Sequence, residues 1–313
     1  MAILKLIPSG KDYLWGGTKL KSEFGKEFSK EKLAETWELS CHFDGPSIVE
    51  NGAYAGKTFR EFILMEGKKV IGEKGQRFEQ FPLLIKFIDA QENLSIQVHP
   101  NNTYALEYEG QYGKTEMWYI VDCEEGAGLY YGFSKEISKE EFQNRIENQT
   151  LLEVLNWIEV KKGDVFFIEP GTIHAIGKGI LIAEIQQNSN VTYRVYDYGR
   201  RDANGKEREL HVEKALQVTN LKPVLQKKSF APYLVSCEYF KVDKVALDGR
   251  LKKRIIGEVD ASSFVSLLIL DGSGEVQAKG EVVKIKKGDS IFITAGSGEY
   301  KLEGCLEALF TTL

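Results

Sequence analysis

Cysteine and histidine are scarce in this chain of 313 residues, which has four of each. The cysteines, Cys41, Cys123, Cys237 and Cys305, are widely separated and none belongs to a Cys-x-x-Cys pair, so neither a disulfide framework nor a paired-cysteine site is indicated. We expect them to be structural thiols in a reducing compartment.

The sequence also lacks long apolar runs and blocks of like charge. No run approaches the roughly 20 residues that span a bilayer, and the opening segment has no apolar stretch suited to a signal peptide. The net charge of −5 argues against nucleic acid or a membrane surface as the main partner. We therefore expect a cytoplasmic monomer or weak homodimer that binds a small molecule, with a local cluster of cations if that ligand is anionic.

From Phe81 onward, short β-branched and aromatic runs such as PLLIKFIDA, EMWYIVDC and DVFFIEPG are separated by Gly, Asp and Asn. This spacing predicts a mainly β fold, with antiparallel sandwiches or barrels rather than βαβ units. Helical signals are fewer. Capping-box patterns occur at Thr58 to Glu61 and at Ser138 to Glu141, and the second predicts a small helical insertion around residues 134–156.

The length favours two domains, because single cores rarely grow beyond roughly 250–300 residues. We place a catalytic domain at 1–220, a linker at 221–233, where two prolines and a basic pair interrupt the pattern, and a second barrel at 234–313. An internal repeat supports two related barrels, since VKKGDVFFIEPGTIHAI from Val160 recurs as IKKGDSIFITAGSGEYKL from Ile285. In this alignment His174 falls on Glu299, and the second copy contains no histidine.

Four residues of the proposed first domain are candidate metal ligands. Gln97 and His99 lie two apart in LSIQVHP, so strand alternation puts both side chains on one face. Such polar groups inside a barrel would cost about 1 to 3 kcal/mol each without partners, and a metal ion would serve both. Glu116 opens the next strand, and His174 is expected to end the strand DVFFIEPGTIH. Mixed nitrogen and oxygen ligands suit zinc, with iron, manganese, cobalt or nickel as alternatives.

These motifs resemble those of the cupin superfamily and, within it, the short bacterial form of the type I mannose-6-phosphate isomerases. Gln97 stands where many cupins have histidine, and the contiguous Pro170-Gly171 also departs from many cupins, but both features are typical of that family. The resemblance covers almost the whole chain and rests on WGG at Trp15, ETWELS at Glu35, QVHPN at Gln97, GKTEMWYI at Gly113, PGTIHAI at Pro170 and EIQQNSNVTYRVYDYGR at Glu184.

The resemblance implies two cupin-type jelly-roll barrels and a zinc-dependent aldose–ketose isomerase acting on mannose 6-phosphate and fructose 6-phosphate through an enediol. It implies one Zn²⁺ per chain, held by Gln97, His99, Glu116 and His174, and a metal-free second barrel. Arg194 matches the family's active-site arginine. Further candidates for catalysis or substrate binding are Glu184, Lys114, Lys86, Gln186 and Trp15.

Chemistry constrains these roles without settling all of them. Arg194 is permanently charged and could stabilise an enediolate or hold a phosphate, and Lys86 and Lys114 are also phosphate candidates. Glu184 lies in an apolar strand, where burial would raise its pKa and suit it as the base, although a structural role is an equal alternative. His42 and His211 are interpreted as structural.

Two other functions remain open at the level of sequence. Another metal-dependent cupin enzyme, such as an iron oxygenase, would favour an all-histidine triad, which Gln97 argues against. A non-catalytic sugar-binding cupin would bind sugar phosphate without turnover, and the complete ligand set together with Arg194 argues against it.

Overall fold

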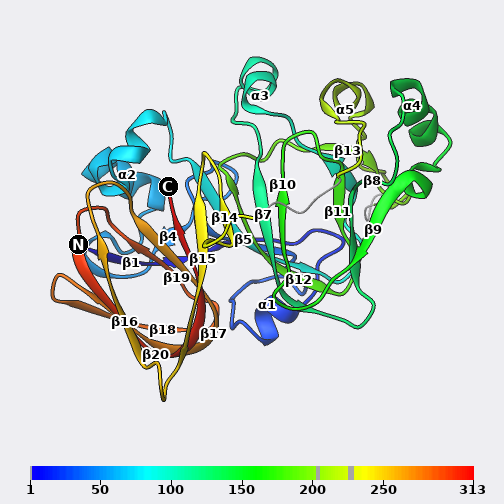
Figure 1. The fold of residues 1–313 in the computed structure, drawn as a ribbon. Helices are drawn as coiled ribbons and strands as arrows, with labels where there is room; N and C mark the ends of the chain where they lie inside the picture. Colours follow the sequence, from blue (N-terminus) through cyan, green and yellow to red (C-terminus); the bar gives the residue numbers. More distant parts are fainter. Residues whose placement is uncertain (1, 202–204, 225–228) are drawn as a thin grey trace.

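The structure is a computed structural model that describes residues 2–201, 205–224 and 229–313. It is mainly β and consists of two cupin-type units that lie side by side (Figure 1). The predicted fold class is therefore confirmed. The first unit contains β2 (Ser9–Lys11), β3 (Glu35–Ser40), β5 (Leu83–Ala90), β6 (Ile96–Val98), β7 (Glu116–Cys123), β8 (Gly128–Phe133), β9 (Leu155–Glu159), β10 (Val165–Ile168), β11 (His174–Ile176), β12 (Ile180–Gln187) and β13 (Tyr193–Tyr196).

These strands form two sheets that enclose the first core. One sheet has the order β10-β7-β12-β5-β3-β2, and the other has the order β13-β6-β11-β8-β9. Apolar side chains such as Ile88, Ile182 and Leu129 pack between them. β5 and β12 are buried along their whole length, which explains their nearly continuous apolar sequences, because both faces of the sheet are covered.

Helices cover the outer face of the second sheet. α4 (Lys139–Glu147) and η4 (Leu151–Val154) form the helical part of the segment 134–156, and α5 (Val212–Val218) packs beside α4 against the same core, which is lined by Phe142, Ile146 and Ala215. α3 (Asn102–Tyr108) lies at the same end of the unit (Figure 1). Ser138 accepts a hydrogen bond from the Glu141 N–H, which fixes the start of α4.

The remaining strands form one nine-stranded sheet that wraps into the second unit. It contains β1 (Ile3–Ile7), β4 (Ile48–Val49), β14 (Val235–Ser236), β15 (Lys241–Asp248), β16 (Arg254–Val259), β17 (Val265–Ala278), β18 (Glu281–Lys286), β19 (Ser290–Ile293) and β20 (Gly298–Thr312). The long strand β17 pairs with β19 through its first residues and with β18 through its last ones, so each half of it has a different neighbour.

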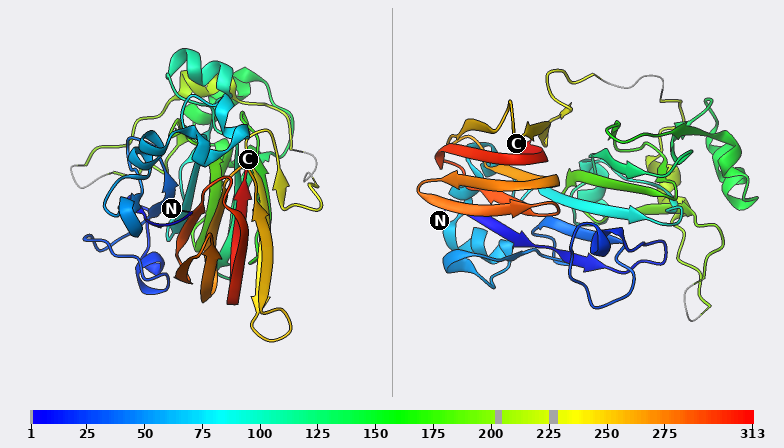
Figure 2. Two further views of the ribbon diagram at one scale, coloured as in Figure 1. Left: turned by 90° about the vertical axis from the view of Figure 1, so that its left-hand side faces the viewer. Right: turned by 90° about the horizontal axis from the view of Figure 1, so that it is seen from below.

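The N-terminal strand belongs to this second sheet. β1 pairs antiparallel with β19, with Ile3 opposite Ile293, and β4 continues the sheet beyond β1. The first residues of the chain therefore complete the unit that its last residues build, as Figure 2 shows. The proposed domain limits at 220 and 234 stay a prediction, and the linker assigned to 221–233 lies partly outside the described residues.

The segment between β4 and β5 is helical. It contains η1 (Gly52–Tyr54), α2 (Phe59–Glu66), η2 (Lys68–Ile71) and η3 (Glu73–Arg77), while α1 (Lys19–Ser22) precedes β3. The Thr58 side chain accepts from the Glu61 N–H, and the Glu61 side chain accepts from the Thr58 N–H, so the predicted capping box starts α2. None of the helices in the described ranges has the length and apolar character that crossing a membrane requires.

One core joins the two units. Phe87 and Met117, on the outer face of the first sheet, belong to the same apolar cluster as Phe264, Phe292 and Leu309 of the second unit. Phe59 of α2 packs in this cluster, with its ring centroid 4.8 Å from that of Phe292. The two units are therefore not separate globules joined by a tether.

The sequence repeat corresponds to two turns of the same geometry. In residues 161–164 and 286–289, the fourth residue, Asp164 or Asp289, accepts a hydrogen bond from the first N–H, at 3.0 and 2.8 Å. Gly163 and Gly288 have φ of 92° and 90°, a region that favours glycine. The Lys-Lys-Gly-Asp repeat is thus a turn motif shared by both units.

The strands beside these turns differ at the position of the candidate ligand Glu116. Ile168 lies opposite Glu116 in the first unit, and the matching residue of the second unit, Ile293, lies opposite Val265. A valine therefore stands where the first unit has a candidate ligand. Glu299, aligned with His174 by sequence, is solvent-exposed.

Candidate active site and metal centre

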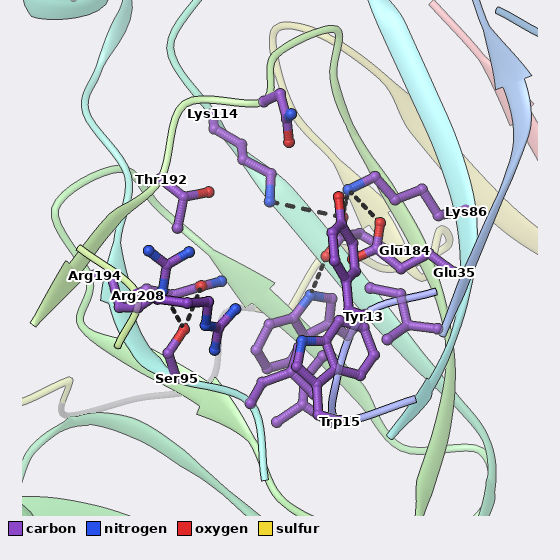
Figure 3. Close-up of a pocket in the computed structure, with 16 residues that line it drawn as sticks. Tyr13, Trp15, Glu35, Lys86, Ser95, Lys114, Glu184, Thr192, Arg194 and Arg208 are labelled. Carbon is purple, nitrogen blue, oxygen red and sulfur yellow. Dashed lines mark hydrogen bonds and ion pairs between the residues drawn. The ribbon is translucent and has the colours of Figure 1, made fainter. Parts of the chain in front are cut away.

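A cavity of about 220 Å³ opens between the two sheets of the first unit. Its walls come from both sheets and from the loop before α1, and they carry two groups of polar side chains (Figure 3). Carboxylates and lysines from β3, β5, β12 and the loop before β7 form one group, and arginines with Ser95 form the other. The lining residues are Tyr13, Trp15, Glu35, Lys86, Ile88, Leu94, Ser95, Gln97, Lys114, Trp118, Ile176, Glu184, Asn190, Thr192, Arg194 and Arg208.

Three of the four predicted ligands meet in one buried cluster. The ligand atoms of His99, Glu116 and His174 lie within 4.8 Å of one another. Glu116 Oε1 is 3.3 Å from His174 Nε2 and 3.7 Å from His99 Nε2. Each side chain is at most 1% exposed. The residues come from β7, β11 and the loop after β6, so the fold collects them from different strands.

The hydrogen bonds of the histidines determine which ring nitrogen faces the cluster. His99 Nδ1 lies 2.9 Å from the Val191 carbonyl, and His174 Nδ1 lies 2.8 Å from the Thr172 carbonyl. Because a carbonyl only accepts, each Nδ1 must donate, and each neutral ring therefore turns a lone pair on Nε2 towards Glu116.

This arrangement fits a cation. Burial and the nearby Lys114 charge hold the pKa of His99 well below its ordinary value, and burial lowers the pKa of His174 to about 4, so both rings are neutral at pH 7. Neither Glu116 Oε1 nor His174 Nε2 has a hydrogen-bond donor among the described residues. Burial raises the pKa of Glu116 to about 7, and either a proton or a metal ion would relieve the repulsion between its oxygen and His174 Nε2, 3.3 Å away.

Gln97, the fourth predicted ligand, lies beside this cluster. It is the cross-strand partner of His174 on β11 and of Arg194 on β13, so the three side chains lie on one face of the sheet. Gln97 also lines the cavity. His174 begins β11 rather than ending β10, because the Pro170-Gly171 turn separates the two strands. That correction leaves its side chain facing inward.

Glu184 lies at the centre of the carboxylate–lysine group. Its Oε2 accepts from the Trp118 indole N–H at 3.0 Å, and its Oε1 is 3.3 Å from Lys86 Nζ and 3.6 Å from Lys114 Nζ. Lys114 Nζ is also 2.7 Å from Glu116 Oε2 and 3.2 Å from His99 Nε2, so it connects the cavity with the candidate metal cluster.

The expected upward shift of the Glu184 pKa is wrong. Burial does favour the protonated carboxyl, but the charges of Lys114 and Lys86 outweigh it and lower the pKa. Lys86 is likewise more than a snorkelling side chain, because it lies in the middle of β5 and is only 4% exposed. Glu184 is therefore an ionised carboxylate at neutral pH.

The arginine group carries an excess of positive charge. Arg194 donates from Nε to Ser95 Oγ at 3.2 Å and from an NH group to the Glu209 carbonyl at 3.0 Å, and no carboxylate pairs with it among the described residues. Arg208 forms a two-pronged pair with Asp197, and Arg200 shares the same carboxylate. Burial and then the charge of Arg208 lower the pKa of Arg194, as expected beside a guanidinium that shares its carboxylate partner with a third arginine.

The other candidates divide between the cavity and the protein interior. Trp15 lines the cavity and is 3% exposed. Gln186 does not line it, because it is fully buried and its amide donates to the carbonyls of Gln187 and Ser189. His42, beside Gln111, and His211, beside Arg194, lie outside the histidine–glutamate cluster.

Sequence reasoning missed three polar residues that line the cavity. Glu35 belongs to a motif noted only for its resemblance, and the strand that it begins, β3, lies before the region in which strands were predicted. Arg208 lies in a polar segment without periodicity, and Tyr13 precedes the WGG motif. Neither offered a local signal, because tertiary contacts alone bring them to the cavity.

Comparisons with known proteins agree with this architecture. Residues 3–125 match the family model of the phosphomannose isomerase type I catalytic domain, and residues 231–312 match that of the mannose-6-phosphate isomerase cupin domain. A mannose-6-phosphate isomerase of Bacillus subtilis (strain 168) is 39% identical, covering 98% of this chain and 97% of its own length. One from Streptococcus mutans is 37% identical, covering 95% and 93% respectively. The crystal structure of the mannose 6-phosphate isomerase from Bacillus subtilis superposes with a TM-score of 0.91 at 36% identity, covering both chains completely.

Proposed function

Because this chain belongs to the type I mannose-6-phosphate isomerase family, we propose that it interconverts mannose 6-phosphate and fructose 6-phosphate in the cavity between its two sheets. Membership of the family makes the protein a cupin isomerase. The observation that carries the assignment of residues is the convergence of two neutral imidazoles and a carboxylate beside a cavity that holds unpaired arginine charge.

One zinc ion per chain is the metal that we assign to this centre. Gln97, His99, Glu116 and His174 would hold it, because two imidazole nitrogens and two side-chain oxygens form a donor set that zinc accepts. When bound, the ion supplies a Lewis acid that polarises or orients the sugar oxygens.

The phosphate group would bind at the arginine end of the cavity. Lys86 and Lys114 are already surrounded by the carboxylates of Glu35, Glu184 and Glu116, so the lysine end offers an anion little net attraction. Arg194 has no carboxylate partner in the described residues, and Arg208 shares Asp197 with a second arginine. Guanidinium groups bind phosphate with paired hydrogen bonds, which suits this end better than the first.

A sugar phosphate held in this way would direct its reacting carbons towards Glu184. Isomerisation moves a proton between C2 of the aldose and C1 of the ketose through an enediol. Glu184 Oε1 is the candidate base, because it is ionised and buried, with the Lys86 and Lys114 ammonium groups 3.3 and 3.6 Å away. It would take the proton from one carbon and return it to the other, while the Trp118 N–H holds Oε2 in place.

The cations around the base would stabilise the intermediate. Lys114 lies between Glu184 and Glu116, where its ammonium can donate to a sugar oxygen as negative charge develops. Trp15 and Trp118 line the same cavity and limit the access of water to the reacting carbons.

Metal analysis together with a coupled isomerase assay tests this function in the wild type and in His174→Ala. The wild type should bind about one zinc per chain and convert mannose 6-phosphate to the ketose, and a chelator should abolish turnover. His174→Ala should lose most of the metal and at least about 100-fold in kcat, since one of four ligands is missing. His42→Asn, which alters a buried histidine outside the cluster, should keep its metal. Full metal content or undiminished turnover in His174→Ala would contradict the assignment.

A further inference from the structure

We propose that Glu35 is a positioning residue of the isomerase reaction, which holds the Lys86 ammonium back from Glu184 Oε1 and so keeps that oxygen available to the substrate. This role presupposes the proposed function and deepens it. Figure 3 places Glu35 beside Lys86 and Glu184 at one end of the cavity, opposite the arginine group.

The fold fixes the place of Lys86 between two carboxylates. On the sheet, Lys86 is the cross-strand partner of Glu184 on one side and of Trp37 on the other. Glu35 lies two residues before Trp37 on the same strand, so its side chain shares the inner face. Lys86 Nζ is 3.3 Å from Glu184 Oε1 and 3.5 Å from Glu35 Oε2. The ammonium is therefore shared between the two acids and lies slightly nearer to Glu184.

A hydrogen bond and burial hold the Glu35 side chain in this position. Its Oε2 accepts from the Trp37 indole N–H at 2.8 Å, and the residue is 7% exposed. The ring of Trp37 lies under the lysine, with Nζ 5.1 Å from the ring centroid. Glu184 is anchored in the same way by Trp118, at 3.0 Å. Two carboxylates, each fixed by an indole, thus compete for one ammonium.

Removal of the Glu35 carboxylate would leave the Lys86 ammonium to pair with Glu184. A buried lysine with a single carboxylate neighbour closes on it, because an uncompensated buried charge is costly. Lys86 would then close the present 3.3 Å separation and donate a shorter, better aligned hydrogen bond to Glu184 Oε1. The proposed base would be both less basic and less accessible. The cost would appear in the chemical step and not in phosphate binding, since the arginines lie at the other end of the cavity.

Glu38 offers a matched control on the same strand. Its carboxylate is completely buried and pairs with Lys26 at 2.6 Å, but it does not line the cavity. Lys26 also donates to the Gly288 carbonyl of the second unit, so this pair links the two units. Glu38→Gln should therefore reduce thermal stability without a specific effect on kcat.

The test measures kcat, KM, metal content and unfolding temperature for Glu35→Gln. Glutamine keeps an acceptor for the Trp37 indole while it removes the charge. We expect kcat to fall about tenfold or more, within the range of general-base effects, with KM changed by less than about threefold and the metal retained. Glu35→Asp, which keeps the charge on a shorter side chain, should lie between Glu35→Gln and the wild type.

A double-mutant cycle with Lys86→Met shows whether Glu35 acts through the lysine. With the ammonium gone, Glu35→Gln should lower kcat by less than about twofold, or raise it. Equal losses in both backgrounds, wild-type kcat in Glu35→Gln, or an equal loss of kcat in Glu38→Gln would overturn the role of Glu35. A wild-type protein without isomerase turnover would instead contradict the proposed function itself.

Discussion

At the scale of single residues, the cavity separates two kinds of cation. Lys86 and Lys114 are enclosed by acids, whereas Arg194 is left without one among the described residues. The same charge therefore serves two purposes. In the proposed function, a lysine held between carboxylates would tune the base, and an arginine without a carboxylate partner would attract the phosphate.

The phosphate assignment can be tested at Arg208. Arg208→Gln removes a guanidinium from the cavity, while Asp197 keeps Arg200 as its partner. We expect KM for mannose 6-phosphate to rise about tenfold, the loss of roughly one charge-assisted hydrogen bond, with kcat within about threefold. Steady-state kinetics with the phosphorylated sugar give this comparison.

Arg201→Gln is the control for that variant. Arg201 pairs with Glu207 near the protein surface and does not line the cavity, so KM should stay at the wild-type value. A KM that is unaffected by Arg208→Gln, or raised equally by both substitutions, would remove Arg208 from the phosphate site.

Thiol reactivity offers a second test at this scale. Cys41 is 7% exposed, and burial raises the pKa of its thiol, so little thiolate forms at pH 8. Cys305 is solvent-exposed on β20. Iodoacetamide should therefore label Cys305 in the native protein within the time in which Cys41 stays unmodified, as peptide mass spectrometry can measure. Equal labelling of both would contradict the packing around Cys41.

At the scale of elements, the two repeated turns provide an internal comparison. An added Cβ at Gly163 meets no atom nearer than 3.9 Å, whereas one at Gly288 would lie 2.6 Å from the Phe24 carbonyl oxygen. Gly163→Ala should cost about 1 to 2 kcal/mol for the positive φ alone. Gly288→Ala should cost at least about 1 kcal/mol more, because a backbone atom of the first unit must move. Thermal unfolding of both variants checks the order, and equal losses would contradict the close contact at Gly288.

The presence of these strands was predictable, because strand formation depends on the local pattern of apolar residues. The runs around Ile85, Trp118 and Ile182 alternate or stay apolar over the length of a strand, and each became one. The break before His174 was not predicted, although Pro170-Gly171 interrupts the apolar pattern at the turn that separates β10 from β11. The metal residues could be named because histidine is rare here and the motifs resemble a known family.

The sequence did not indicate which strands pair when they are far apart along the chain. Nothing in the run around Ile3 indicates that it pairs with Ile293, because an edge strand of either unit would have the same composition. The roles of Glu35 and Arg208 depend equally on contacts across strands and loops. The pKa of Glu184 was misjudged for the same reason, since its two lysine neighbours are distant in sequence.

At the scale of the whole molecule, the shared core should make the two units unfold together. The cluster that includes Phe87, Phe292 and Leu309 spans both, and β1 belongs to the sheet of the second unit. Calorimetry should therefore give a single transition, because opening either unit would expose the core of the other. Two well-separated transitions would contradict this coupling.

The pairing of β1 also orders events during synthesis. Ile3–Ile7 is synthesised well before its partner, Ser290–Ile293, because most of the described residues lie between them in sequence. Until the later strand emerges from the ribosome, the apolar edge of the earlier strand stays unpaired and is open to binding by a chaperone. The pairing of β1 with β19 therefore forms late, once Ser290–Ile293 has been made.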